Sequence, residues 1–256
     1  MKMKIANIVG HSILKNGRIT SADGIINEYE YNKKMVPYVS KYIKAVCPDW
    51  DVVTIICPEK KFLFSTQERL YKLGLINGNK YDEIHEYHLN SYNGSAKGSE
   101  SLYKSSSGKR LADADQRKMK TVFVDRGSKL RNNLYILNGT DCPAVLHESF
   151  FCDNKGDVSI GEDYKEIARL HAEAITGKSI AKNILDKKTS KKKKYGTIAT
   201  KNDPLRMRYA ANSTARVIQT IKKGEKVEIV SKGKSWHKCK YNGFTGYCSA
   251  KYIKLL

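Results

Sequence analysis

The chain has 256 residues and a formal net charge of +21, from 47 Lys and Arg against 26 Asp and Glu. The excess is concentrated at one end, because residues 178–256 carry 21 basic and 4 acidic side chains whereas residues 1–177 carry 26 and 22. No apolar stretch approaches the roughly 18 residues that a membrane-spanning helix needs, which excludes that class. The basic end predicts a polyanionic partner, namely nucleic acid, an anionic membrane or an anionic wall polymer.

The N-terminus does not resemble a secretory signal. The apolar run IANIV is interrupted at once by Gly10-His11-Ser12, so it is too short for a signal core. We therefore expect synthesis as a soluble cytoplasmic chain. The six cysteines form no C-x-x-C pair, which argues against a structural zinc knuckle and favours reduced, mostly buried thiols; they are Cys47, Cys57, Cys142, Cys152, Cys239 and Cys248.

The first half begins with alternating strand-like and helix-like segments. The run KIANIVG at residues 4–10 predicts a strand, and apolar residues at helical spacing predict a helix over 27–46, with a kink at Pro37. The β-branched run DVVTIIC predicts a strand with both faces covered. Ser65-Thr66-Gln67-Glu68 has the pattern of a capping box and predicts the start of a short helix.

The same alternation continues to about residue 177. We expect a strand over 81–90, a Gly- and Ser-rich loop over 93–107, a helix near 109–120, a strand over 143–151 and a helix over 164–176. Such alternation predicts an α/β domain over residues 1–177, with a mostly parallel sheet and helices on both faces.

The composition changes after Gly177. Residues 178–195 contain a run of four lysines and few large apolar side chains after Leu185, which predicts a basic, flexible linker. Residues 196–256 contain short strand patterns, and Asn242-Gly243 predicts a two-residue type I′ hairpin turn. Pairing outward from this turn places Cys239 diagonal to Cys248, so we expect two free thiols within a small all-β barrel.

The segment YDEIHEYHLN at residues 81–90 nearly contains the zinc-protease motif H-E-x-x-H, but its histidines are three residues apart instead of four. The segment has the length of a strand, on which His85 and His88 point to opposite faces while Glu86 and His88 share one. A zinc helix is therefore disfavoured. If His88 binds a metal, its partners must come from other elements.

Three residues at other element ends are candidate partners for His88. His11 follows the first strand, Glu28 begins the next helix, and Glu148 is a carboxylate within an apolar strand, where it is costly unless paired, protonated or functional. Two imidazoles and one carboxylate around an open position are the ligand set of a catalytic Zn²⁺, and a second carboxylate near the metal's water can act as general base.

The runs IVGHS, INEYEYN, YDEIHEYHLN and LYILNGTDCPAVLHESFFCDNKGD resemble the four motifs of the zinc-dependent N-acetylmuramoyl-L-alanine amidases, and more narrowly those of clostridial phage endolysins. The resemblance covers about residues 4–177. It implies a twisted, mixed six-stranded sheet, with His11, Glu28 and His88 as zinc ligands and Glu148 as the catalytic acid and base. The implied reaction is hydrolysis, by zinc-activated water, of the amide that joins N-acetylmuramic acid to L-alanine of the stem peptide.

The resemblance also has departures and weaker correspondences. The chain has Asn7-Ile8-Val9-Gly10-His11-Ser12 where Asp-Pro-Gly-His-Gly is common, and His147 precedes Glu148 where an aliphatic residue is usual. Glu86 is a candidate substrate contact because it shares a strand face with His88, and Asn90 and Arg126 are candidates because they match family positions near the cleft. The alternatives are a solvated or salt-bridged strand residue for Glu86, and ordinary loop positions for Asn90 and Arg126.

Residues 197–256 resemble a bacterial SH3 domain through ARVIQTIKKGEKVEIV, Trp236 and the hairpin KYNGFTGYCSAKYI. Arg206–Ala211 departs from the usual polar run. The resemblance implies a module that targets peptidoglycan. Tyr209, Trp236 and Tyr247 are candidate wall-binding residues, with Tyr252 also available, although each aromatic residue is equally suited to a barrel core. Lysines beside such aromatic residues suit peptide cross-links and anionic wall polymers.

The leading interpretation is a phage endolysin, a peptidoglycan amidase made in the host cytoplasm that reaches the wall after release. A zinc peptidase that cleaves stem peptides is the second enzymatic interpretation. A basic nucleic-acid-binding protein is a third, because SH3-like barrels of high positive charge can bind phosphates. It is disfavoured, and no nucleic acid is expected, because the four polar motif residues would then have no role.

Overall fold

The computed structural model describes residues 2–185 and 194–256, which belong to two compact units, Met1–Asp186 and Lys187–Leu256. Among the described residues, no helix combines the length and the apolar character needed to cross a membrane.

The first unit is built on a six-stranded sheet with the strand order β2-β1-β3-β6-β4-β5. All neighbouring strands are parallel except β4 and β6, which are antiparallel. This confirms the predicted mixed, mostly parallel sheet. The strands are β1 (Lys4–Val9), β2 (Asp51–Ile55), β3 (Glu83–Asn90), β4 (Ser99–Tyr103), β5 (Asp125–Leu130) and β6 (Ala144–Phe151).

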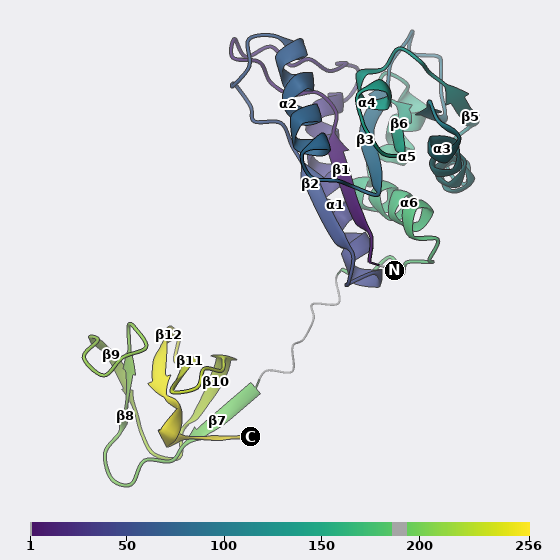
Figure 1. The fold of residues 1–256 in the computed structure, drawn as a ribbon. Helices are drawn as coiled ribbons and strands as arrows, with labels where there is room; N and C mark the ends of the chain where they lie inside the picture. Colours follow the sequence, from purple (N-terminus) through teal and green to yellow (C-terminus); the bar gives the residue numbers. More distant parts are fainter. Residues whose placement is uncertain (1, 186–193) are drawn as a thin grey trace. The chain divides into compact units, whose positions relative to one another are not determined.

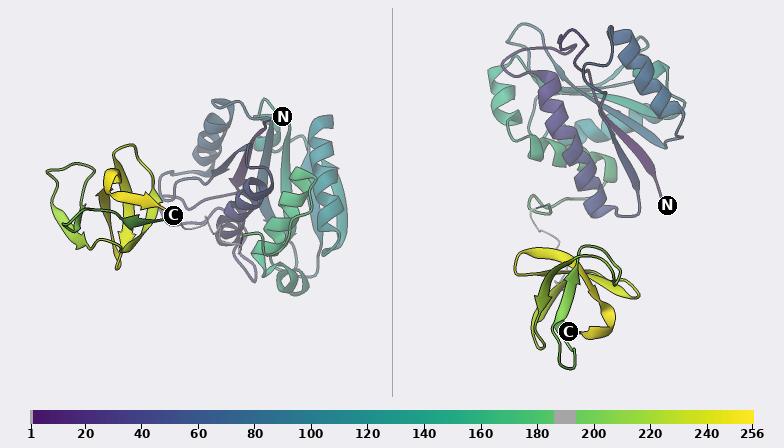
Figure 2. Two further views of the ribbon diagram at one scale, coloured as in Figure 1. Left: turned by 90° about the horizontal axis from the view of Figure 1, so that it is seen from below. Right: turned by 90° about the vertical axis from the view of Figure 1, so that its left-hand side faces the viewer.

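Helices cover both faces of this sheet (Figures 1 and 2). One apolar cluster joins the sheet to α1, α3, α5 and α6, and a second joins its other face to α2 and α4. Period-two alternation along the strands supplies both clusters, since Tyr87 faces the first and Ile84 the second. The helices are α1 (Glu28–Val46), α2 (Ser65–Asn77), α3 (Ser106–Met119), α4 (Tyr135–Asn138), α5 (Lys155–Gly161) and α6 (Tyr164–Thr176).

Strand β4 and the start of helix α2 differ from the sequence predictions. Strand β4 lies within residues 93–107, which were predicted to be a loop, and its buried Ser99 and Ser101 hydroxyls contact the side chain of Gln116 at 3.1 and 3.0 Å. Helix α2 does begin at Ser65, but Phe64 occupies the N-cap position. The capping contact comes from Gln67, whose Oε1 accepts the Leu63 and Phe64 amides at 2.9 and 3.3 Å.

Only part of the predicted linker 178–195 is described, because residues 186–193 lie outside the described ranges. Residues 178–185 belong to the first unit and contact α6: Ile180 is buried, its amide donates to Glu173 Oε1 at 2.7 Å, and its carbonyl accepts from Arg169 at 3.1 Å. The chain therefore continues to contact α6 beyond the helix end at Thr176.

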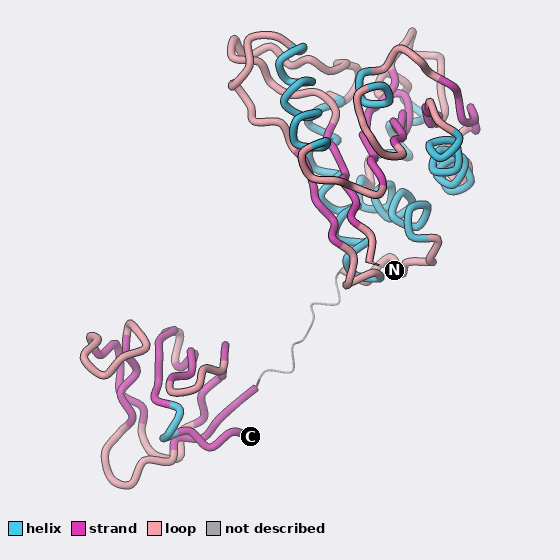
Figure 3. Tube along the Cα trace, in the orientation of Figure 1, coloured by secondary structure: helices cyan, strands magenta, loops and turns pink. Residues whose placement is uncertain are grey.

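The second unit is a seven-stranded antiparallel sheet with the order β13-β7-β10-β11-β12-β8-β9. Figure 3 shows its strands in magenta. The predicted hairpin is present, with Asn242 and Gly243 both at positive φ, as a type I′ turn requires. Cys239 and Cys248 are buried and do not form a disulfide, as predicted. The strands are β7 (Lys194–Ile198), β8 (Leu205–Arg208), β9 (Val217–Ile221), β10 (Lys226–Ser231), β11 (Trp236–Tyr241), β12 (Phe244–Ser249) and β13 (Ile253–Leu255), with a 3-10 turn at Ala250–Tyr252.

Candidate metal centre

His11, Glu28 and His88 come together although they are far apart in the sequence. His88 Nδ1 lies 2.8 Å from Glu28 Oε1 and 3.1 Å from His11 Nε2, and the latter atom lies 3.2 Å from Glu28 Oε1. His11 follows β1, Glu28 is the first residue of α1 and His88 lies in β3. Since β1 and β3 are adjacent and parallel, their carboxyl ends meet at one edge of the sheet, where the start of α1 also lies.

The backbone before His11 is shaped to admit the ring of His88. A Cβ atom at Gly10 would lie 2.5 Å from Cε1 and 2.6 Å from Nε2 of His88, so only glycine fits this approach. His11 itself has a φ of 62°, a left-handed conformation that is uncommon for a residue with a side chain. The turn thus directs the two imidazole rings toward each other, with their centroids 4.7 Å apart.

Glu28 is fixed by both of its oxygens. Oε1 accepts the Leu89 amide at 3.1 Å and Oε2 accepts the Ala22 amide at 2.9 Å. Burial favours the neutral acid, but hydrogen bonds and charge interactions with His11 and His88 outweigh it and hold the pKa of Glu28 well below its usual range. Burial likewise opposes the charged form of His88, and Glu28 and Glu86 overcome it, which raises the pKa of His88 to about 10. The cluster therefore favours a bound positive charge.

Glu148 lies directly beside His88, because these two residues are register partners on the parallel strands β3 and β6. It is partly exposed, and its Oε2 has no hydrogen-bond partner within residues 2–185 and 194–256. Burial, together with the charges of Glu28, Glu100 and Glu86, raises the pKa of Glu148 to about 8, although His88 opposes the shift. An unpaired carboxyl group with a pKa near neutrality is suited to proton transfer.

The three residues predicted to contact the substrate lie in different environments. Glu86 is completely buried between Lys72, Tyr135 and His88, so it cannot reach a substrate, and that assignment is corrected. Asn90 lies half-buried at the end of β3, where its Oδ1 accepts the Ser91 amide. Arg126 donates to Glu100 at 2.7 Å, and Glu100 is the β4 register partner of Glu148. Asn90 and Arg126 remain predictions as substrate contacts.

A second group of potential metal ligands, Asp115, His147 and His171, lies buried on the other face of β6. Both carboxylate oxygens of Asp115 already have partners within the protein. His171 Nδ1 lies 2.7 Å from Asp115 Oδ1, and His147 Nδ1 and Ser101 Oγ each lie 2.8 Å from Asp115 Oδ2. The cluster is a hydrogen-bonded part of the core, and it ties α3 and α6 to β6. Asp115 was not predicted to have a special role, because an aspartate on a helix gives no indication in the sequence of such partners.

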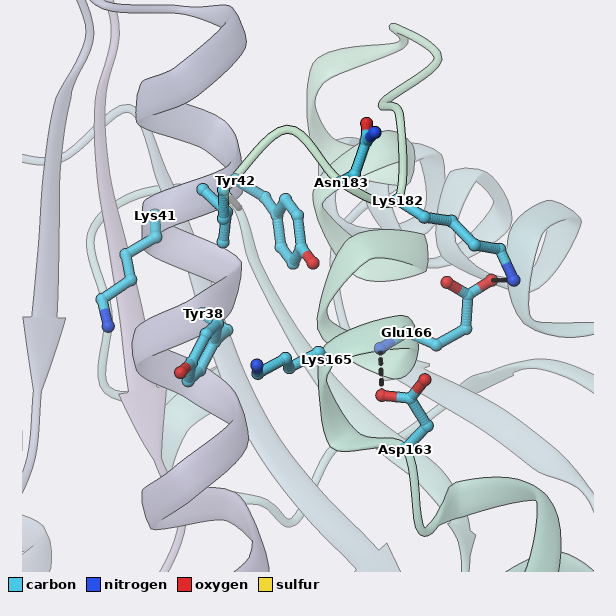
Figure 4. A pocket seen from close by; sticks show the side chains of 9 residues that line it. Tyr38, Lys41, Tyr42, Asp163, Lys165, Glu166, Lys182 and Asn183 are labelled. Carbon is cyan, nitrogen blue, oxygen red and sulfur yellow. Dashed lines mark hydrogen bonds and ion pairs between the residues drawn. The ribbon is translucent and has the colours of Figure 1, made fainter. Parts of the chain in front are cut away.

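A cavity of about 490 Å³ lies between α1, α6 and residues 182–185 and is lined by Tyr38, Lys41 and Lys182, among others (Figure 4). Tyr38 lies ten residues beyond Glu28 on α1. At a rise of 1.5 Å per residue, this places the cavity about 15 Å along the helix from the metal cluster. The cavity is therefore separate from the candidate site.

In the second unit, Trp236 and Tyr252 line one cavity of about 870 Å³. The basic residues Lys201, Arg206, Arg208 and Lys251 also line it, with Asp203 as the acidic one. The other two candidate wall-binding residues, Tyr209 and Tyr247, are not among the lining residues; Tyr209 is exposed and Tyr247 lies beside Lys238. Trp236 is thus the candidate that combines a cavity with cationic surroundings.

The donor set of the first cluster fits a catalytic zinc. Two imidazole nitrogens and one carboxylate oxygen are the usual three protein ligands. At zinc–ligand distances of 2.0–2.2 Å, tetrahedral ligands lie about 3.3 Å apart, close to the separations of 2.8, 3.1 and 3.2 Å found here. A three-layered α/β fold with this cluster beside an unpaired glutamate is typical of metal-dependent hydrolases.

Comparison with known proteins gives the family. The N-acetylmuramoyl-L-alanine amidase family matches residues 5–177, and the bacterial SH3 domain family matches residues 203–254. The chain belongs to the N-acetylmuramoyl-L-alanine amidases, which are generally zinc-dependent. It is a peptidoglycan amidase with a bacterial SH3 domain that binds the cell wall. No curated protein matches the chain.

Solved structures agree with this assignment. The catalytic domain of the CD27L endolysin targeting Clostridia Difficile is 46% identical, with a TM-score of 0.67, over 70% of this chain and 99% of that one. The catalytic domain of the amidase CwlV from Bacillus (Paenibacillus) polymyxa var. colistinus is 25% identical, with a TM-score of 0.56, over 68% and 97%. The amidase AmiC2 of Nostoc punctiforme, at 17% identity and a TM-score of 0.57, over 68% and 96%, shares the fold.

Proposed function

We propose that His11, Glu28 and His88 hold one Zn²⁺ and that Glu148 is the catalytic acid and base for hydrolysis of the N-acetylmuramic acid–L-alanine amide. The supporting observation is the meeting of three donor atoms within 3.2 Å of one another beside a glutamate with an unpaired carboxylate oxygen. When bound, zinc supplies a Lewis acid that polarises a carbonyl and lowers the pKa of water from 15.7 to about 7.

Glu148 has the position and the proton affinity for the rest of the chemistry. It accepts a proton from the attacking water and later donates it to the leaving nitrogen. The water oxygen bonds to the lactyl carbonyl carbon and the C–N bond breaks, which leaves a carboxylate on muramic acid and a free amine on L-alanine. Arg126 and Asn90 are proposed to contact the substrate from β5 and the end of β3.

We propose that the cavity around Trp236 binds the wall. Trp236 and Tyr252 offer apolar faces for a peptide cross-link, and the four surrounding cations offer charge complementarity to an anionic wall polymer. The division into a catalytic domain over 1–177, a basic linker over 178–195 and a wall-binding domain over 196–256 belongs to the same proposal. It is supported by the change in composition and charge at residue 178.

The biological role that fits this combination is that of an endolysin. We propose that the chain is made in the host cytoplasm and acts at the wall after release. Its 46% identity to the catalytic domain of the CD27L endolysin supports this role.

Replacing Glu148 by glutamine tests the mechanism. We expect about one zinc per chain to remain, because Glu148 is not a ligand, and wall hydrolysis to fall by roughly 10²–10⁴-fold, as expected for loss of proton transfer. The exposed Glu162→Gln variant is the matched control. Products should carry new N-terminal alanine and free muramic lactyl carboxylate. Full activity of Glu148→Gln, or cleavage only between amino acids of the stem peptide, would refute the assignment.

A further inference from the structure

Helix α2 presents a charged stripe to the interior of the first unit. Glu68, Lys72 and Ile76, four residues apart, are its buried side chains, and Lys72 is only 1% exposed. Ile76 packs in the apolar cluster between the sheet and α2, as expected for an apolar residue on the buried side of a helix. Burying an ammonium group and a carboxylate is costly unless both are paired. The two charged residues therefore need a specific explanation.

Lys72 lies between two buried carboxylates. Its Nζ is 2.9 Å from Glu86 Oε1 on β3 and 3.4 Å from Glu68 Oε1 on its own helix. The Tyr135 hydroxyl also donates to Glu86 Oε1. One ammonium group thus neutralises half of the negative charge of the pair and fixes one oxygen of each carboxylate.

The second oxygen of Glu86 faces a ligand of the proposed zinc. Glu86 Oε2 lies 3.4 Å from His88 Nε2, a charge contact and not a hydrogen bond, since neither buried atom has a hydrogen-bond partner among the described residues. The other nitrogen of the ring, Nδ1, faces Glu28 and His11. A proton held on Nε2 by Glu86 leaves the lone pair of Nδ1 directed toward the metal.

The second oxygen of Glu68 leads to the other histidine. Glu68 Oε2 accepts the Ser12 hydroxyl at 2.9 Å and the Thr20 hydroxyl at 3.2 Å. Thr20 Oγ1 lies 3.4 Å from His11 Nδ1, while His11 Nε2 faces the metal position. The threonine hydroxyl donates to Glu68 and accepts the Ser12 amide at 3.1 Å, so its second lone pair can accept the proton of Nδ1. Both histidines are thus connected on their outer side to carboxylates that share Lys72.

We propose that Lys72 is a positioning residue that, through Glu86 and through Glu68 with Thr20, fixes the orientation and tautomer of both histidines of the zinc site. The inference rests on the zinc site proposed above. Without the ammonium group, two buried carboxylates would face each other uncompensated, and one of them would turn away. The histidine that it held would then lose its outer partner, which weakens metal binding.

The test compares zinc binding by the full-length Lys72→Met variant, which keeps the length of the side chain without its charge, with binding by the wild type. Competition with a chelator gives the affinity, and the absorption spectrum of the Co²⁺-substituted protein reports ligand geometry. We expect an affinity 10–100-fold lower and an altered spectrum. Lys109→Met, which removes an exposed pair with Asp113, is the matched control and should leave both unchanged.

Thr20→Val serves as a second variant in case Lys72→Met does not fold, because it keeps Lys72 and both carboxylates and removes the hydroxyl that contacts His11 Nδ1, Glu68 and the Ser12 amide. It should weaken zinc binding while the zinc-free protein melts near the wild-type temperature. Wild-type zinc affinity in folded Lys72→Met would refute the proposed role of Lys72. Wild-type zinc affinity in folded Thr20→Val would refute the proposed connection from Glu68 through Thr20 to His11. Failure of the wild type to bind zinc would instead refute the zinc site itself, so the two failures are distinguishable.

Discussion

Gly10 shows how strongly one backbone position constrains the site. The Gly10→Ala variant would place a methyl group 2.5–2.6 Å from the His88 ring and from the Tyr87 carbonyl oxygen. We expect displacement of His88, loss of zinc and at least a tenfold loss of wall hydrolysis, measured by metal content and turbidity. Gly74→Ala is the control, since a Cβ there meets nothing within 4 Å on a helix where alanine is favoured by about 1 kcal/mol. Equal zinc content in the two variants would contradict the steric argument.

His147 makes stability depend on pH. Burial lowers its pKa to about 4, despite the nearby Asp115, whereas the unfolded residue titrates near pH 6.5. Between these values the unfolded chain binds a proton that the folded chain does not, so the free energy of unfolding falls as the pH drops. The contribution is about 2 kcal/mol between pH 7 and pH 5.

The measurement is urea unfolding at pH 7 and pH 5 in the presence of a chelator, which removes effects of metal release. His147→Gln cannot take up the proton, so its free energy of unfolding should fall less over this interval. Equal changes in the two proteins would show that His147 does not contribute.

At the residue scale, the sequence predicted which face of a strand a side chain occupies. It did not predict which side chains from other elements contact it. Alternation along YDEIHEYHLN correctly separated His85 from His88, which face opposite sides of β3. The alternation of side chains also placed Glu86 on the same strand face as His88. It could not predict the contact of Glu86 with Lys72, because Lys72 lies on α2. A lysine in a short helix is ordinarily exposed, and only the tertiary contact with Glu86 explains its burial.

At the scale of elements, strands with apolar runs were predicted and polar ones were not. β1, β2, β3 and β6 carry continuous or alternating apolar residues, whereas β4 reads SESLY and β5 reads DRGSKL. Their polar side chains are satisfied by partners from elsewhere, such as Gln116 on α3 for the serines of β4. Such long-range hydrogen bonds leave no local periodicity, so β4 and β5 could not be predicted from the sequence pattern.

The segment after α6 provides a prediction at the same scale. A catalytic unit that ends at Gly177 lacks Ile180, which is 2% exposed, and the contacts of that residue with Arg169 and Glu173. Burial of one isoleucine side chain contributes about 1.5–3 kcal/mol, so thermal unfolding should show a lower midpoint than that of a unit ending at Leu185. Identical midpoints would mean that residues 178–185 add nothing to stability.

At the scale of the whole molecule, binding to the wall and cleavage should be separable. Trp236→Ala removes the main aromatic face of the cationic cavity, so retention on isolated walls should fall about tenfold and salt should weaken it further. Hydrolysis of a small soluble muramyl peptide should stay unchanged, because the proposed catalytic residues all lie in the first unit. Tyr209→Ala, outside the cavity lining, is the control; equal losses in both variants would argue against the cavity as the wall-binding site.

The assembly of the metal cluster from His11, Glu28 and His88, with Glu148 beside it, has a practical consequence. The proposed zinc ligands and Glu148 all belong to the first unit, so the bond that is cleaved should not change when another anchor is grafted in place of residues 196–256. Such chimaeras would keep their cleavage product while acquiring a new host range.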